Sequence, residues 1–154
     1  MVMGVSGAGK STIGAALARE LRWRFIDADD HHPPANVAKM AAGEPLSDED
    51  RAPWLDRLNL ILKSQENAVL ACSALKQSYR DRLSAGLADL RFVYLKGDAG
   101  LIGARLSGRR HPYMPASLLA SQLEALEPPE KAIAVDISAE VPACVAAIVE
   151  ELGL

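Results

Sequence analysis

Short apolar segments alternate with longer segments of helical periodicity along the whole chain. The apolar runs, each of the length of a strand, are Val2–Val5, Arg24–Asp27, Ala68–Cys72, Arg91–Lys96 and Ala132–Ile137. Each run is apolar enough to be covered on both faces, which is typical of parallel sheets. The pattern therefore predicts a three-layer α/β fold, in which helices cover both faces of a five-stranded parallel sheet.

Two of the helical segments carry further signals. The last helix has one apolar stripe, made of Val141, Val145, Ile148, Val149 and Leu152, opposite two glutamates. Another helix is predicted to begin near Ser47, because Ser47-Asp48-Glu49-Asp50 resembles a capping box. Its inward residues would be Trp54, Leu58, Ile61 and Leu62. Pro53 should limit how early this helix is regular, since its ring would clash with the carbonyl four residues back.

Composition narrows the class of protein. The 154 residues, 49% of them apolar, suit a single domain spanning 1–154. No apolar run approaches the roughly 20 residues that span a bilayer, and the start lacks a secretion-signal pattern, so we expect a soluble, cytoplasmic protein without membrane contacts. A net charge of −3 argues against nucleic acid as a partner. Cys72 and Cys144 are expected to be small core residues. The first strand begins almost at residue 1, which leaves open whether residues precede it.

The segment Gly4-Val5-Ser6-Gly7-Ala8-Gly9-Lys10-Ser11 matches the complete phosphate-binding loop pattern. In such a loop the glycines allow successive N–H groups to face the phosphates of ATP. Lys10 would reach the β- and γ-phosphates and Ser11 would offer its hydroxyl to Mg²⁺, with Thr12 completing the nucleotide site. The motif requires a strand before it and a helix after it, and both are predicted here.

Several classes of nucleotide-binding protein share this loop, so the acceptor site must distinguish them. The chain has no Asn-Lys-x-Asp segment with which a GTPase would read guanine. The segment 71–76 also lacks the run of apolar residues ending in an acid that usually forms the Walker B strand of a motor ATPase. A small-molecule kinase remains, with a catalytically silent ATP-binding module as the alternative from another class.

Acidic residues follow the second predicted strand, beside the phosphate-binding loop. If the strand continued, alternation would put Asp27 and Asp29 on one side, where one could hold a Mg²⁺ water and the other could take the proton of the acceptor hydroxyl. The alternative for these carboxylates is helix capping in a turn, which fits Asp30 best. The sequence predicts Asp27 as a metal-binding residue and Asp29 as a catalytic residue.

At this point the residues resemble the gluconokinase family. The motifs that carry the resemblance cover nearly the whole chain. They are Asp27-Ala28-Asp29, His32-Pro33, Asn36, Lys39-Met40, Gly43-Glu44-Pro45-Leu46, Asp48, Asp50-Arg51, Pro53-Trp54-Leu55, Cys72-Ser73-Ala74-Leu75-Lys76, Tyr79-Arg80-Asp81, Tyr94-Leu95-Lys96-Gly97-Asp98, Ser121-Gln122 and Leu126-Glu127-Pro128-Pro129. The resemblance implies transfer of the ATP γ-phosphate to the 6-hydroxyl of D-gluconate. It also implies a fold like those of nucleoside monophosphate and shikimate kinases, and it suggests a homodimer.

An open-chain sugar acid needs a cation for its carboxylate and polar groups for its hydroxyls. By resemblance, the acceptor pocket contains Asp29 and four further residues: His32, Arg51, Lys76 and Arg80. Each of the two arginines could instead pair with a neighbouring acid on an exposed helix. His32, which precedes a proline, could instead be a hydrogen-bonded turn residue.

A cationic, proline-containing segment at approximately 108–116 is interpreted as a short lid. Arg109 would be brought over the phosphates, and Arg105 resembles the position that stacks on adenine in related kinases, although a solvated surface arginine is the alternative. The segment departs from the family pattern at Arg110, His111 and Tyr113, whose roles stay open. Ala28 also stands where the family commonly has glycine.

A kinase for another small hydroxy acid, such as shikimate, is the alternative activity. A shikimate kinase would be expected to have three glycines after the third strand, where this chain has Ser73-Ala74-Leu75.

Overall fold

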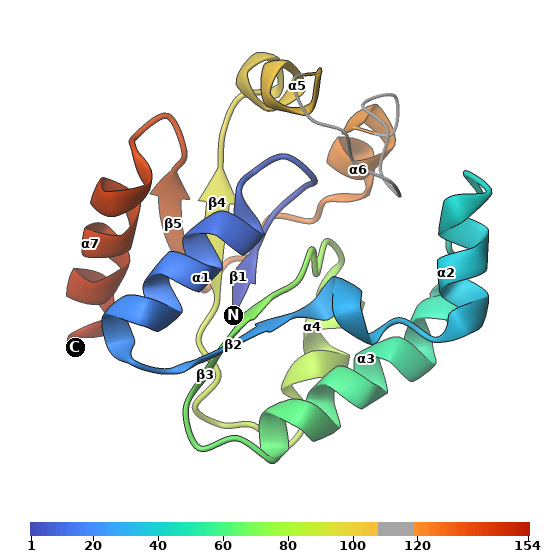
Figure 1. The fold of residues 1–154 in the computed structure, drawn as a ribbon, viewed down its shortest axis with the longest axis horizontal. Helices are drawn as coiled ribbons and strands as arrows, with labels where there is room; N and C mark the ends of the chain where they lie inside the picture. Colours follow the sequence, from blue (N-terminus) through green and yellow to red (C-terminus); the bar gives the residue numbers. More distant parts are fainter. Residues whose placement is uncertain (108–118) are drawn as a thin grey trace.

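The computed structural model describes residues 1–107 and 119–154 (Figure 1). Strands and helices alternate along the chain, as the apolar pattern predicts. In chain order they are β1 (Val2–Met3), α1 (Lys10–Leu21), β2 (Arg24–Asp27), the 3-10 helix η1 (Ala28–His31), α2 (Pro34–Ala41), α3 (Asp48–Lys63), β3 (Ala68–Ala71), α4 (Gln77–Ser84), β4 (Val93–Lys96), α5 (Ala99–Ser107), α6 (Leu119–Ala125), β5 (Ile133–Asp136) and α7 (Val141–Leu152).

The five strands form one parallel sheet in the order β2-β3-β1-β4-β5, so the predicted sheet is confirmed. Four of the five strands are shorter than predicted, and β1 shows why. It ends at Met3 rather than Val5, because Val5 already belongs to the loop, where its carbonyl accepts a hydrogen bond from the Ala8 N–H at 3.2 Å.

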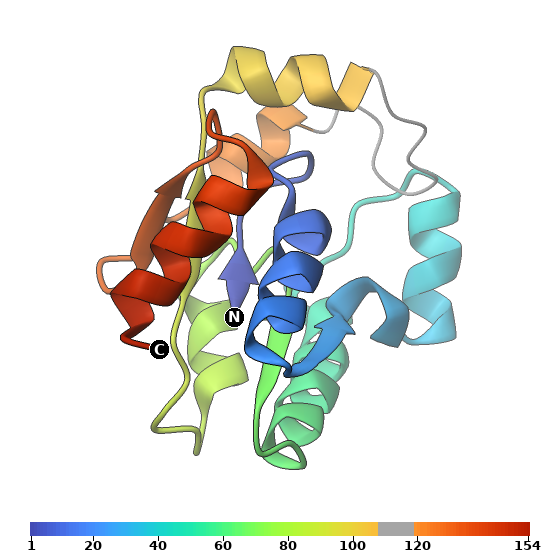
Figure 2. The same ribbon diagram turned by 60° about the vertical axis from the view of Figure 1, so that its left-hand side comes forward.

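Helices cover both faces of the sheet, as predicted. Helices α1 and α7 pack side by side on one face, and α3 and α4 pack together on the other (Figures 1 and 2). Successive strand residues enter different cores: Val2 joins the core under α1 and α7, whereas Met3 joins the core under α3 and α4. This alternation explains why the strands read as continuous apolar runs.

The predicted capping box at the start of α3 is present. The Ser47 hydroxyl accepts from the Asp50 N–H at 3.1 Å, and the Asp50 carboxylate accepts from the Ser47 N–H at 2.9 Å. Trp54, Leu58 and Leu62 are buried and Ile61 is half-buried, as expected. The expectation for Pro53 was wrong, because α3 is continuous from Asp48 to Lys63 and contains it.

Both cysteines are buried and unpaired, which confirms them as core residues. In the two ranges that the structure describes, no helix is both long and apolar enough to cross a membrane. The chain direction reverses around β1: it runs from β1 outward to β2, returns through β3, and crosses to β4 on the other side. Such a switch point leaves a crevice at the carboxyl ends of the strands, where α/β sheets bind ligands.

Candidate functional site

A cavity of about 350 Å³ lies at this switch point. Its walls come from the loop after β1, the turn after β2, the segment between α2 and α3, the loop after β3, and single faces of α3, α4 and α6. The volume lies within the range of small-molecule sites. Chain segments far apart in the sequence therefore meet at the carboxyl edge of the sheet.

The phosphate-binding loop, residues 4–11, forms one wall of the cavity. Gly7 and Gly9 have φ angles of 83° and 96°, in the left-handed region that glycine adopts without strain. A Cβ atom on Gly7 would also lie only 2.7 Å from Leu106 Cγ. Gly9 is the N-cap of α1 and provides no side-chain cap, so the first N–H groups of α1 remain available for an anion.

Lys10 lies at the first position of α1 and lines the cavity. Its Nζ atom donates to the Val5 carbonyl at 3.0 Å, which folds the side chain back over the loop. Burial lowers the pKa of Lys10, while the nearby carboxylates of Asp29 and Asp27 oppose that shift. Ser6, Ser11 and Thr12 line the cavity with Lys10, and so do Gly7 and Gly9. The remaining loop residues predicted to bind ATP, namely Gly4, Val5 and Ala8, do not line it, and the side chains of Val5 and Ala8 are buried in the core.

Asp27 and Asp29 both line the cavity, but not by strand alternation. The strand ends at Asp27, and Asp29 lies on the 3-10 helix that follows. One Asp27 oxygen accepts from the Asp29 N–H at 3.0 Å, and the other accepts from the Ser11 hydroxyl at 2.7 Å. Asp27 is therefore the acid that caps the turn, and it joins that turn to the phosphate-binding loop.

The chemistry of this pair fits a magnesium ion. The hydroxyl of Ser11 and the carboxylate of Asp27 are hard oxygen donors beside the predicted phosphate position. Mg²⁺ is usually bound by one or two protein oxygens together with substrate phosphates and water. Among the described residues, no group of three or more His, Cys, Asp or Glu side chains could hold a metal without such help.

His32 lines the cavity and is held on two sides. Its ring stacks on Trp54 with 4.0 Å between the ring centroids and 17° between the ring planes. Its Nδ1 atom lies 3.3 Å from the amide nitrogen of Asn36. Burial, together with the cationic Arg51 nearby, lowers the pKa of His32 to about 4. The imidazole is therefore neutral at physiological pH, and it can exchange a hydrogen bond with a ligand without carrying charge.

Arg51 and Lys76 also line the cavity, and both lie close to the ring of Tyr79. The Arg51 guanidinium lies 5.4 Å from the centre of the Tyr79 ring, and Lys76 Nζ lies 5.6 Å from it. The Tyr79 hydroxyl donates to Asp48 at 2.5 Å, and this bond holds the pKa of the Asp48 carboxyl below its usual value. Two cations beside a single aspartate leave this wall suited to an additional anionic group.

Arg80 is not brought into the cavity. Its side chain is buried, at 2% exposure, and its guanidinium donates to the carbonyls of Ala74 (2.7 Å), Leu75 (3.1 Å) and Glu127 (2.7 Å). The side chain of Gln77 accepts two more of its N–H groups. The geometry therefore assigns Arg80 to the loop after β3 and the segment after α6, rather than to the acceptor pocket.

The two arginines predicted to contact the nucleotide are placed differently. Arg105, on α5, donates to the Ile137 carbonyl at 2.8 Å and does not line the cavity. Arg109 and the predicted lid, approximately 108–116, lie outside the described residues, as do Arg110, His111 and Tyr113. Their roles stay predictions from sequence.

Tyr79, Trp54, Cys72 and Gln122 also line the cavity, although none was predicted as a site residue. Gln122 is the least expected, because its side-chain oxygen accepts from the Ser6 N–H of the phosphate-binding loop at 2.6 Å across 116 residues of sequence. The segment Ser121-Gln122 carried the family resemblance, and that was the only signal for it.

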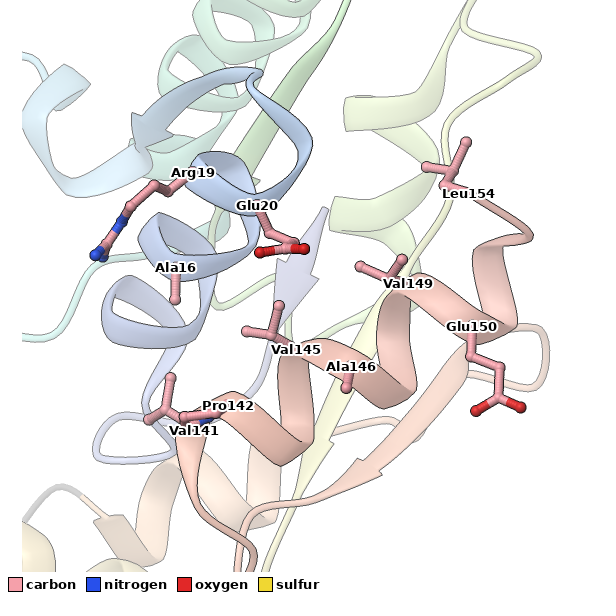
Figure 3. Close-up of a pocket in the computed structure, with 10 residues that line it drawn as sticks. All are labelled: Ala16, Arg19, Glu20, Val141, Pro142, Val145, Ala146, Val149, Glu150 and Leu154. Atoms are coloured by element: carbon pink, nitrogen blue, oxygen red, sulfur yellow. The ribbon is translucent and has the colours of Figure 1, made fainter.

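A second hollow lies between α1 and α7 (Figure 3). Small apolar side chains such as Ala16, Val145 and Ala146 line it, and Arg19 and Glu150 stand at its edges. It contains no residue of the phosphate-binding loop. The first cavity is therefore the candidate active site.

Comparisons with known proteins agree with this geometry. The family model for shikimate kinase matches residues 6–139. The gluconokinase of Gluconobacter oxydans (strain 621H) is 50% identical over 133 residues, which cover 84% of this chain and 75% of that protein. The crystal structure of a gluconokinase from Sinorhizobium meliloti 1021 matches with a TM-score of 0.90 at 43% identity, covering 99% of this chain and 89% of the other. A shikimate kinase from Bacteroides thetaiotaomicron matches with a TM-score of 0.67 over 99% and 97% of the two chains.

The shikimate kinase structure is 15% identical to this chain and shows the shared fold alone. Sequence identity of 43 to 50% is shared instead with gluconokinases from bacteria and a plant and with a probable gluconokinase from Mus musculus. The segment Ser73-Ala74-Leu75 after β3 also lacks the glycines expected of a shikimate kinase. The resemblance found in the sequence is thus confirmed, and the chain belongs to the gluconokinase family of P-loop kinases.

Proposed function

We propose that this protein transfers the γ-phosphoryl group of ATP to the 6-hydroxyl of D-gluconate, giving 6-phospho-D-gluconate and ADP. The observation that supports this activity best is that one cavity contains both the phosphate-binding loop and a cationic wall with Arg51 and Lys76. The loop suits a nucleotide, and the cationic wall suits the carboxylate of a sugar acid. The names of the relatives point to the same acceptor.

In the proposed reaction, the 6-hydroxyl oxygen attacks the γ-phosphorus, the bond to the β-phosphate oxygen breaks, and ADP leaves. Asp29 would orient that hydroxyl and accept its proton. Lys10 would contact the transferring phosphoryl group. Ser11 and Asp27 would hold Mg²⁺, which neutralises charge on the phosphates when it is bound. The proposed position of Arg109 over the phosphates rests on the sequence alone.

The acceptor would lie with its carboxylate toward Arg51 and Lys76 and with its terminal hydroxyl toward Asp29. His32 would contact a hydroxyl of the chain between these ends. Arg80, which the sequence assigned to this pocket, supports it from behind by holding the carbonyls of Ala74 and Leu75.

The test is an ADP-release assay with ATP, Mg²⁺ and a panel of acceptors: D-gluconate, shikimate, other sugar acids, nucleoside monophosphates and no acceptor. Among these acceptors, we expect only D-gluconate to give ADP release. The Lys10→Ala variant, which should lose phosphate binding and transfer together, is the control for contaminating kinases. Turnover with shikimate instead of gluconate would keep the kinase and contradict the acceptor. If the protein binds ATP but releases ADP with none of the acceptors, it is a non-catalytic ATP-binding module.

A further inference from the structure

Asn36, in the first turn of α2, is one of the few polar side chains that are almost completely buried, at 3% exposure. Its side-chain nitrogen donates to the Asp50 carbonyl at 2.9 Å, and the same nitrogen lies 3.3 Å from His32 Nδ1. An amide nitrogen carries two hydrogens and no free lone pair. Both of its hydrogens therefore have an acceptor available, one in the backbone of α3 and one in the imidazole ring.

The Asp50 carbonyl fixes the direction of the second bond. A carbonyl oxygen can only accept, so the atom facing it must be the amide nitrogen and not the amide oxygen of Asn36. That nitrogen can only donate to His32. The Nδ1 atom of His32 must then present its lone pair, because an N–H there would point at another N–H. In a neutral imidazole the proton is consequently on Nε2.

The ring plane is fixed independently of Asn36. Trp54 stacks on His32, and its own Nε1 atom is anchored by a 2.8 Å hydrogen bond to the Ala28 carbonyl. His32 Nε2 makes no hydrogen bond to the described residues, yet no buried side-chain nitrogen among them lacks a partner. Nε2 is therefore not fully buried, and His32 is a lining residue of the active-site cavity.

We propose that Asn36 is a positioning residue that holds His32 in its Nε2-protonated form, so that His32 gives the acceptor substrate a hydrogen-bond donor. The substrate class rests on the proposed function, since the partner would be a hydroxyl oxygen of a polyhydroxy acid. The tautomer itself follows from the contacts of Asn36 alone. Neutral His32 would add a directed donor to a wall that already contains the cation Arg51, without adding further charge.

The first measurement is the tautomer of His32 in the wild-type protein, read from ¹⁵N chemical shifts and long-range ¹H–¹⁵N couplings of the imidazole at pH 7. The chain has 3 histidines, so a spectrum of the His32→Gln variant assigns the signals. We expect a protonated Nε2 and an unprotonated Nδ1. A protonated Nδ1, or an imidazolium, would overturn the proposal even if no variant of Asn36 folds.

The second measurement compares Asn36→Ala with Asn59→Ala. Asn59 is a matched control, since it is also a buried asparagine, at 7% exposure, and its amide donates to the carbonyls of Leu83 and Ala85 outside the cavity. Asn36→Ala should give a mixture of His32 tautomers and raise KM for gluconate about tenfold, as expected for the loss of one oriented hydrogen bond, with little change in KM for ATP. Asn59→Ala should lower stability alone and leave the tautomer and both KM values unchanged.

Equal tautomer populations and equal KM values in the two variants would contradict the proposal, because Asn36 would then be a merely structural residue. The acceptor assay separates this outcome from a failure of the proposed function. If the wild-type protein shows the expected tautomer but does not phosphorylate gluconate, the positioning role of Asn36 is supported and the assigned substrate is wrong.

Discussion

Asp27 and Asp29 are two residues apart, line one cavity, and differ in what surrounds them. Both oxygens of Asp27 are engaged, one with the Ser11 hydroxyl and one with the Asp29 N–H. Asp29 lies on the 3-10 helix and lines the cavity, as His32 does. In the proposed reaction Asp27 holds Mg²⁺ beside Ser11, and Asp29 acts on the acceptor.

Asp29→Asn should abolish the proton acceptor while keeping the shape of the side chain. We expect kcat with gluconate to fall by about 10²–10⁴-fold, with ATP binding changed little. The measurement is steady-state ADP release together with calorimetric ATP binding. Asp30→Asn is the matched control, because Asp30 is exposed and does not line the cavity. Equal activity of the two variants would remove Asp29 from the reaction.

At the scale of the element, α3 carries the wall of the acceptor pocket, and its start is fixed by the capping box of Ser47 and Asp50. Asp50 also forms an ion pair with Lys39 of α2 at 2.8 Å. The cap therefore joins the helix that carries Asn36 to the helix from which Arg51 and Trp54 reach the cavity. Lys39, the Ser47 N–H and the Ser47 hydroxyl together hold the pKa of the Asp50 carboxyl at about 2.

Ser47→Ala should remove the side-chain acceptor for the Asp50 N–H and lower the free energy of unfolding by about 1 kcal/mol. Urea denaturation followed by circular dichroism measures this change. The control is Ser64→Ala at the other end of α3, where the exposed hydroxyl donates to the Ile61 carbonyl and accepts from the Gln65 side-chain amide but caps no backbone N–H. A smaller loss for Ser47→Ala than for Ser64→Ala would contradict the importance of the cap.

Helix α4 is tied to the segment after α6 by Arg80. Arg80→Met keeps much of the apolar volume but leaves the carbonyls of Ala74 and Glu127 without their donor, so we expect a loss of about 2–4 kcal/mol in unfolding free energy. Arg82→Met, which breaks the ion pair with Asp56, should cost much less, because both side chains of that pair are exposed to solvent. If Arg80→Met instead kept its stability and raised KM for gluconate, Arg80 would belong to the acceptor pocket after all.

The sequence predicted the five strands because each residue of a strand such as Val2-Met3 faces one of two cores. The end of β2 at Asp27 was predicted, but capping of the turn that follows was assigned to Asp30 rather than to Asp27. Asp27-Ala28-Asp29 alternates as a strand would, but the Asp27 carboxylate accepts the Asp29 N–H and so competes with strand pairing. Such a local bond leaves no mark on the apolar pattern.

Site residues were predicted where a motif fixes the role of each position, as in the phosphate-binding loop. Arg80 was predictable as a helical residue and not as a buried one, because its carbonyl partner in Glu127 lies 47 residues away. The contact of Gln122 with Ser6 spans a still longer separation. Pairings of this kind depend on the packing of the complete fold.

At the scale of the whole molecule, His32 links stability to pH. Its pKa is lowered from 6.5 to about 4 in the folded protein. Between these values the unfolded chain binds a proton and the folded protein does not, so stability is fully present above pH 6.5 and decreases as the pH falls toward 4. We expect urea midpoints to decrease over this window.

The same measurement on His32→Gln should give a flatter profile, whereas His31→Gln, a change at the neighbouring histidine, should keep the slope of the wild-type protein. A further decrease toward pH 2 is expected in all three proteins, because the lowered pKa of Asp50 contributes stability that is lost on protonation. An identical slope for His32→Gln and the wild type between pH 6.5 and 4 would show that His32 titrates normally.

The stack of His32 on Trp54 gives the protein an intrinsic optical reporter. The chain has 2 tryptophans, and Trp54 lines the active-site cavity while Trp23 packs half-buried against the core on the other face of the sheet. Gluconate in the cavity would change the polarity around the Trp54 indole and leave that of Trp23 unaltered. Acceptor binding is therefore expected to change the fluorescence of the unlabelled protein, and Trp54→Phe to remove that signal while Trp23→Phe retains it.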